Sequence, residues 1–252
     1  MLERFYNQLS PYYKYIFQDW NASVERQAIL LDEVFREYFG GRVHSILDAA
    51  CGIGTQCIGL AQKGYTLTAA DISPGEIEKA RLEASKRKLD IAFHVADMRN
   101  LQQTFQTKFD LVIACDNAVP HLLSDYEIRQ AFQQFYQITS DSGGCLISVR
   151  DYDAMERGGR KLYPRQVHDI PGGKIVIFDC WDFDGDFYDI TMYIVEDTGQ
   201  PTAKASVIRG GRYYCVPISK LEKLMKDGGF ATVVTLKDRF YHPHLFQALW
   251  FP

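Results

Sequence analysis

The sequence is poor in three features, and each shortage excludes a class of protein. With 9 prolines in 252 residues and 46% hydrophobic residues, it is neither disordered nor fibrous. No run approaches the roughly 18 apolar residues of a membrane span, and the first twenty residues mix charges with tyrosines, unlike a signal peptide. Basic charge is not in excess, because 28 Lys and Arg stand against 32 Asp and Glu. We therefore expect a cytoplasmic globular protein that binds neither membranes nor nucleic acid.

The cysteines lack the spacing of a metal site or a redox motif. The six cysteines include no CxxC pair, and no clustered histidines accompany them. A chain of 252 residues can bury enough apolar surface to fold without disulfides. We therefore expect no metal centre, and thiols that are reduced and mostly buried.

Short β-rich apolar runs alternate with helical stretches between Val43 and Arg150. This alternation is typical of a doubly wound, mostly parallel α/β sheet with helices on both faces. Gly143 and Gly144 are expected to form the turn before the last of these strands. The pattern predicts strands over 43–49, 65–71, 91–96, 109–115 and 145–150, and helices over 55–63, 74–88 and 126–138.

The pattern changes after Arg150. Two strands are predicted to meet at Asp184-Gly185, a residue pair favoured in type I′ hairpin turns. We interpret the chain as one domain, 1–252, with an aromatic helical arm (1–42), a core (43–150), an antiparallel insertion (151–216) and a final core part (217–252). The insertion has expected strands over 174–183, 187–195 and 205–216, and the final part has a helix over 219–226 and strands over 232–236 and 246–250.

The first predicted strand ends in a turn that contains Gly52 and Gly54. Glycines at such a turn let a ligand approach the backbone closely. The dinucleotide fingerprint GxGxxG requires a third glycine where this chain has Cys57, which disfavours a dinucleotide. Asp48 lies just before the turn, where it can accept a hydrogen bond from a cationic amino group.

Acidic residues also close the next two strands. Asp71 is placed to accept both hydroxyls of a ribose. Asp97 offers a carboxylate to an exocyclic amine, and Met98 offers an apolar side chain to a purine ring. Each of these residues alone is more often a turn aspartate or a helix cap. Together with Asp48 they indicate an adenosine that carries a positively charged amino-acid tail.

The segment LDAACGIG at 47–54, with Asp71 and ADM at 96–98, resembles the class I S-adenosylmethionine-dependent methyltransferases. Within them, VIACDNAVPHL at 112–122, VRDYD at 149–153 and the tyrosines at 213–214 are similar to the glycine N-methyltransferase family. The similarity runs from about Tyr12 to Trp250 and is strongest over 46–122. It implies a seven-stranded methyltransferase sheet with an antiparallel lid, and S-adenosylmethionine as cofactor with S-adenosylhomocysteine as product. The expected cofactor-binding residues are Tyr12, Tyr15, Asp48, Ala50, Gly52, Gly54, Asp71, Ile72, Asp97, Met98 and the run from Cys115 and Asp116 to Ala118.

The same resemblance places Asn117, Arg150 and one of the two tyrosines at 213–214 at an amino-acid substrate, and we take Tyr214 as the candidate. Arg150 ends a buried strand, where an unpaired guanidinium is costly, so it needs an anion such as a substrate carboxylate. A structural pair with Asp151 or with the aspartate at 153 is the alternative. His121 could take the proton of the amine or only orient it.

The loop after the fourth strand lacks the Asn-Pro-Pro-aromatic or Asp-Pro-Pro-aromatic tetrad typical of methyltransferases that act on adenine bases or glutamine side chains. We therefore expect methylation of a small molecule, foremost the amino nitrogen of glycine or a related amino acid. A different nitrogen or oxygen nucleophile, and a cofactor-binding regulator without turnover, remain alternatives. A homo-oligomer is compatible with the sequence.

Overall fold

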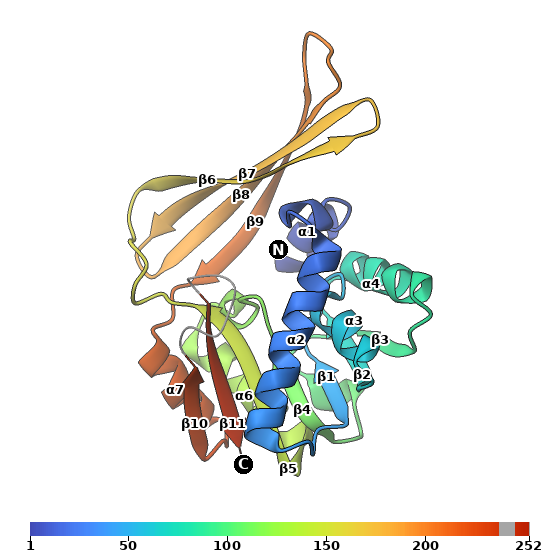
Figure 1. Ribbon diagram of the computed structural model, residues 1–252. Helices are drawn as coiled ribbons and strands as arrows, with labels where there is room; N and C mark the ends of the chain where they lie inside the picture. Colours follow the sequence, from blue (N-terminus) through green and yellow to red (C-terminus); the bar gives the residue numbers. More distant parts are fainter. Residues whose placement is uncertain (237–244, 252) are drawn as a thin grey trace.

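A computed structural model describes residues 1–236 and the backbone of residues 245–251. It contains a central sheet and a separate antiparallel sheet, with helices packed around the central one (Figure 1). Five strands of the central sheet run parallel, and β11 pairs antiparallel with both β5 and β10. In sheet order the strands are β10 (Thr232–Leu236), β11 (Leu245–Phe251), β5 (Thr139–Arg150), β4 (Phe109–Ala114), β1 (Ser45–Asp48), β2 (Thr66–Asp71) and β3 (Ile91–Val95).

Helices cover both faces of the central sheet, which explains why its inner strands β1 and β4 are almost wholly buried. Successive strand residues point to opposite faces. Ile46 therefore packs in one hydrophobic cluster and Leu47 in the other. The Ile46 cluster is formed with α2 (Trp20–Phe39), α3 (Thr55–Gln62) and α4 (Pro74–Lys86), and the Leu47 cluster with α6 (Asp125–Ile138) and α7 (Ile218–Asp227).

The predicted antiparallel insertion is confirmed, but it has four strands rather than three. They are β6 (Arg160–Ile170), β7 (Gly173–Asp184), β8 (Phe187–Asp197) and β9 (Lys204–Tyr214), paired in that order. The strand β6 was not predicted, because it is rich in charged residues and contains Pro164, which sequence patterns place outside regular strands. Pro164 is tolerated because β6 is an edge strand.

The hairpin predicted at Asp184-Gly185 is confirmed, but its turn type is wrong, and a second expected turn is wrong as well. The β7–β8 turn has Gly185 and Asp186 at its centre, and only Gly185 has a positive φ (58°), whereas a type I′ turn needs two. Gly143 and Gly144 lie inside β5 rather than before it. A Cβ on Gly143 would lie 2.4 Å from the carbonyl oxygen of Asp110, so glycine here permits a close approach of β4 and β5. The strand predicted over 145–150 begins earlier, at Thr139, and the remaining predicted strands and helices agree with the structure to within two residues at each end.

The N-terminal arm bridges the two sheets. Helix α1 (Leu2–Leu9) lies between the antiparallel sheet and α4 (Figure 1). Phe5 is buried against Gly211 of β9, where an added Cβ would lie 2.9 Å from the ring. On the other side, the Asn7 side-chain oxygen accepts hydrogen bonds from the Ser73 hydroxyl (2.7 Å) and the Gly75 amide (2.9 Å). The arm continues through a short 3₁₀ turn, η1 (Tyr13–Ile16), to α2, which Asp19 caps.

All six cysteines are free, and all except Cys180 are buried, as the sequence predicts. Among the described residues, no group of His, Cys, Asp and Glu side chains is arranged to hold a metal ion. No helix in that part of the chain is both long and apolar enough to cross a bilayer.

Candidate functional site

A cavity of about 380 Å³ lies at the carboxyl ends of β1, β2, β3 and β4, within the volume range of small-molecule sites. The strand-end turns form its floor, and α1 closes its side with Tyr6, next to Tyr13 of η1. The cavity therefore lies where ligands bind in open α/β sheets. Of the residues expected to bind the cofactor, those that line it are Ala50, Gly52, Asp71, Ile72, Asp97, Met98, Cys115, Asp116 and Ala118.

At the first strand-end turn, the expected residues Asp48 and Gly54 do not line the cavity. Asp48 is fully buried just before the turn, its Oδ1 lies 3.4 Å from the Ala50 amide, and its Oδ2 has no hydrogen-bond partner among the described residues. Burial raises the pKa of Asp48 to about 8. Gly54 shapes the turn instead, since it has a φ of 95° and a Cβ there would lie 2.8 Å from Ile58.

Asp71 is held at the cavity edge by two backbone amides. Its Oδ2 accepts from the Gly52 N–H and its Oδ1 from the Ser73 N–H, both at 2.9 Å. Burial raises the pKa of this carboxyl despite these hydrogen bonds. Each oxygen keeps a lone pair for a further donor, so the fixed carboxylate can receive two hydroxyl groups.

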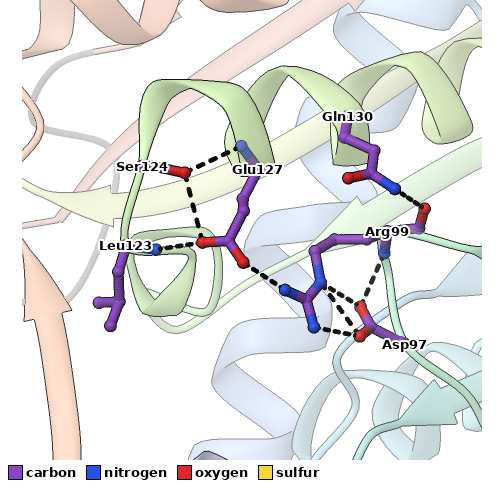
Figure 2. Close-up of polar contacts among 6 residues, drawn as sticks. All are labelled: Asp97, Arg99, Leu123, Ser124, Glu127 and Gln130. Carbon is purple, nitrogen blue, oxygen red and sulfur yellow. Dashed lines mark hydrogen bonds and ion pairs between the residues drawn. The ribbon is translucent and has the colours of Figure 1, made fainter.

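Asp97 belongs to an ion-pair network that sequence reasoning missed (Figure 2). The Arg99 Nε donates to both Asp97 oxygens at 3.0 Å, and its guanidinium also pairs with Glu127 of α6. Burial alone favours the neutral acid, but the hydrogen bonds from Arg99 hold the pKa of Asp97 below its usual value. Glu127 in turn accepts from the Leu123 amide at 3.1 Å. The network ties the end of β3 to α6 and keeps Asp97 ionised as an acceptor.

The loop after β4 adopts a costly backbone conformation. Asp116 and Asn117 have φ values of 54° and 67°. These values lie in the left-handed region of backbone conformation, which residues other than glycine rarely adopt. Ser148 of β5 fixes both residues, because its hydroxyl accepts from the Asp116 amide (2.8 Å) and its carbonyl from the Asn117 amide (2.9 Å). The Asp116 carboxylate, which faces the cavity, accepts from Gln56 at 2.8 Å.

Asn117 was expected to accept a hydrogen bond from the substrate amine, and the structure gives its side chain another partner. Its Oδ1 accepts from the backbone amide of Arg150 at 3.0 Å, and its amide group also contacts the Tyr152 hydroxyl. Asn117 is not among the residues that line the cavity. Its amide instead holds the end of β5 in place, since the left-handed loop turns the side chain toward that strand.

The expected aromatic contacts from the arm, Tyr12 and Tyr15, do not line the cavity. The Tyr12 hydroxyl donates to Glu196 at 3.2 Å, and Tyr15 packs against His168 of β6. Residues three apart lie on the same face of a 3₁₀ turn, so both side chains point toward the antiparallel sheet. Tyr6 and Tyr13 line the cavity instead.

His121 lines the cavity and is held from both sides. Its Nε2 lies 2.6 Å from the Tyr6 hydroxyl, and its Nδ1 lies 2.9 Å from the carbonyl oxygen of Arg212. Burial, with a further contribution from the Arg150 charge, lowers the pKa of His121 to about 3. His121 is therefore neutral, and of its two expected roles orientation fits better than proton acceptance.

Arg150 lies among aromatic rings and has no acidic partner among the described residues. Its guanidinium donates to the Tyr188 hydroxyl at 2.7 Å and lies 4.7 Å from the centre of the Trp181 ring. The alternative of a structural ion pair is wrong, because Asp151 caps its own turn and Asp153 accepts from the amide that begins α7. A cation in such a setting retains donors for an anionic ligand.

The tyrosine beside Arg150 is Tyr213, not Tyr214. The Tyr214 hydroxyl donates to Asp125 of α6 and accepts from Lys220 of α7, both at 2.9 Å. The Tyr214 side chain therefore points toward these two helices. Successive residues of β9 point to opposite faces, so Tyr213 points the other way. Its ring lies 3.8 Å from that of His121 and 5.7 Å from the Arg150 guanidinium.

Comparison with known proteins agrees with this geometry. Residues 46–143 match the methyltransferase domain family. A glycine/sarcosine N-methyltransferase from Parasynechococcus marenigrum is 31% identical over 56% of this chain and 49% of its own length. Another, from Aphanothece halophytica, is 27% identical over 57% of this chain and 53% of its own length. The chain thus spans about half the length of the curated relatives it matches.

A structural likeness extends over nearly the whole chain. An amino pentose methyltransferase from Micromonospora echinaspora, solved with S-adenosylmethionine bound, superposes with a TM-score of 0.77 at 16% identity and covers 94% of each chain. At that identity the likeness shows a shared fold. The chain therefore matches the methyltransferase domain family over residues 46–143, is similar in sequence to the glycine/sarcosine N-methyltransferases, and shares its fold with a methyltransferase solved with S-adenosylmethionine bound.

Proposed function

We propose that the protein is an enzyme that transfers a methyl group from S-adenosylmethionine to the amino nitrogen of a small molecule with a carboxylate, foremost glycine or a related amino acid. The observation that carries this proposal is Arg150, a partly buried cation without an acidic partner among the described residues. Arg150 does not itself line the cavity, but its guanidinium lies 5.7 Å from the Tyr213 ring, which packs on His121 of the cavity wall. The glycine/sarcosine N-methyltransferases among the relatives support it. The test is product analysis by mass spectrometry after incubation with S-adenosylmethionine and glycine, sarcosine or a metabolite panel. Methylation of only hydroxyl compounds, or of nothing, would contradict the proposal.

The residues of the cavity fit S-adenosylmethionine. Asp71 would hold the ribose hydroxyls, and Asp97 and Met98 the adenine. Asp48 does not line the cavity but directly precedes Ala49, which does, and its Oδ2, without a partner among the described residues, would receive the ammonium of the amino-acid tail. An orphaned buried acceptor is costly, and a cationic donor at this place would satisfy it. When bound, the cofactor supplies a methyl group on a positively charged sulfur.

The protein contributes alignment rather than a strong base. Arg150 would hold the substrate carboxylate, and the rings of Trp181 and Tyr213 would exclude water from the reacting groups. A neutral amine needs no deprotonation before it attacks the methyl group, so correct placement supplies most of the catalysis. The arm (1–42) and the insertion (151–216) would together act as the lid, and the core (43–150 and 217–252) as the cofactor platform.

Replacing Asp71 by asparagine is expected to weaken S-adenosylhomocysteine binding about 10-fold to 100-fold, because hydrogen bonds to a charged acceptor contribute roughly 1.5–3 kcal/mol. Calorimetry measures the change. Asp110→Asn is a matched control, since Asp110 also accepts two backbone amides at 2.9 Å, but at the opposite end of β1. NAD should bind the wild-type protein more weakly than S-adenosylhomocysteine. Tighter binding of NAD would reverse the assignment of the cavity.

Asp48 is expected to release a proton when S-adenosylhomocysteine binds at pH 7, because the ligand ammonium lowers a carboxyl pKa that stands at about 8 in the free protein. Calorimetry in buffers of different ionisation enthalpy detects this proton. Since the folded pKa is raised, the stability of the free protein should fall as the pH rises from about 4 to 8. Asp48→Asn should abolish both effects. Unchanged proton release in that variant would assign the proton to another group.

A further inference from the structure

The Tyr6 hydroxyl is a polar group of the cavity that the proposed function does not use. It reaches the cavity from α1, in the N-terminal arm. Its oxygen lies 2.6 Å from the His121 Nε2 and 3.4 Å from the Tyr213 hydroxyl. The Tyr213 ring also lies 5.7 Å from the Arg150 guanidinium. Tyr6 and Arg150 thus both lie next to Tyr213.

The hydrogen bonds of His121 determine which way the Tyr6 proton points. The carbonyl oxygen of Arg212 can only accept, so the His121 Nδ1 beside it must carry the hydrogen. A neutral imidazole then has its lone pair on Nε2, and the Tyr6 hydroxyl must be the donor between them. With its proton committed to His121, the Tyr6 oxygen has only lone pairs left to offer to the cavity.

We propose that Tyr6 contacts the methyl acceptor: its oxygen accepts an N–H of the substrate amine and so directs the nitrogen lone pair toward the methyl group. His121 acts through Tyr6 as a positioning residue, because it fixes the Tyr6 proton. The inference rests on the proposed function. In the reaction the C–N bond forms as the C–S bond breaks, the sulfur becomes neutral, and the new ammonium keeps its proton until the product reaches solvent.

This arrangement limits the number of methyl groups that the enzyme adds. Neutral glycine has two N–H groups and sarcosine has one, so either can donate to Tyr6. Neutral dimethylglycine has none and would lose this orientation. Dimethylglycine should therefore be a much poorer acceptor than sarcosine.

The test compares Tyr6→Phe with Tyr12→Phe, whose hydroxyl bonds to Glu196 outside the cavity. Tyr6→Phe is expected to lower kcat with glycine and sarcosine about 100-fold, the scale of a lost alignment. The Kd of S-adenosylhomocysteine should change less than threefold, and the preference for sarcosine over dimethylglycine should collapse. Tyr12→Phe should leave all three quantities unchanged. His121→Ala should lower kcat, and His121→Gln, which keeps an acceptor near Tyr6, should restore part of it.

Two results would overturn the inference. The first is a Tyr6→Phe enzyme with the wild-type kcat. The second is a Tyr6→Phe enzyme that loses kcat and S-adenosylhomocysteine affinity in the same proportion, because the arm would then have only a structural role. Failure of the proposed function is seen earlier, in the wild-type protein. If that protein methylates neither glycine nor sarcosine, the proposed substrate is wrong, and the inference fails with it.

Discussion

Arg150→Lys is expected to raise the KM for glycine about 10-fold to 100-fold while the affinity for S-adenosylhomocysteine stays unchanged. Lysine keeps the charge but lacks the planar fork that grips a carboxylate with two hydrogen bonds. Arg150→Met removes the charge as well and should raise KM further. Stability should not fall with it, because Arg150 has no carboxylate partner among the described residues that would be left unpaired.

Steady-state kinetics and thermal unfolding of the three proteins check this expectation. Arg160→Lys is a matched control, because its exposed guanidinium pairs, among the described residues, only with Asp182 on the antiparallel sheet. Glycinamide, which lacks the carboxylate, should be as poor a substrate for the wild-type enzyme as glycine is for Arg150→Met. If Arg150→Met unfolded at a much lower temperature and glycinamide were methylated normally, Arg150 would be a structural residue.

Displacing the arm is expected to remove more than 99% of turnover, because water would then reach the reacting groups and Tyr6 would leave the cavity. Gly211→Val should have this effect without removing any residue, since a Cβ at Gly211 would lie 2.9 Å from the Phe5 ring. Deletion of residues 1–18 should do the same while keeping Asp19, the cap of α2.

Circular dichroism should show an intact central sheet in both variants, and kcat measures the loss. Ala205→Val is the control, because Ala205 is an exposed residue of the same strand, β9. A deletion variant with the kcat and cofactor affinity of the full chain would show that the arm has no part in catalysis.

The parallel core could be predicted because its signals are local. The strands β1 and β2 are short runs followed by a glycine turn at Gly52 and by Ser73, which caps α4. The strand β6 was missed because its place in the sheet depends on pairing with β7, and its own residues are polar. The turn expected at Gly143 and Gly144 failed for a similar reason, since these glycines serve a contact with β4.

The residues of the candidate site also differ in whether a local sequence signal identifies them. The positions of Asp71, Asp97 and Met98 follow from the ends of strands, so the sequence predicts their shared edge. Tyr6 could not be found this way, because the residue it contacts lies 115 positions along the chain. Arg99 follows Met98 directly, and the signal that could have identified it is a basic residue two positions after a strand-end aspartate. The choice between Tyr213 and its neighbour depends on where β9 begins, which is the least certain part of any strand prediction.

The left-handed pair Asp116 and Asn117 has a consequence for efforts to make the enzyme more thermostable. Each residue in this conformation costs on the order of 1 kcal/mol or more, and glycine would remove the penalty. Asn117→Gly should nevertheless yield no gain, because the Asn117 side chain bonds to the Arg150 amide that ends β5. A design strategy that replaces residues by backbone conformation alone would choose this loop, and a glycine at position 117 would release the Arg150 amide and put the alignment of Arg150 at risk.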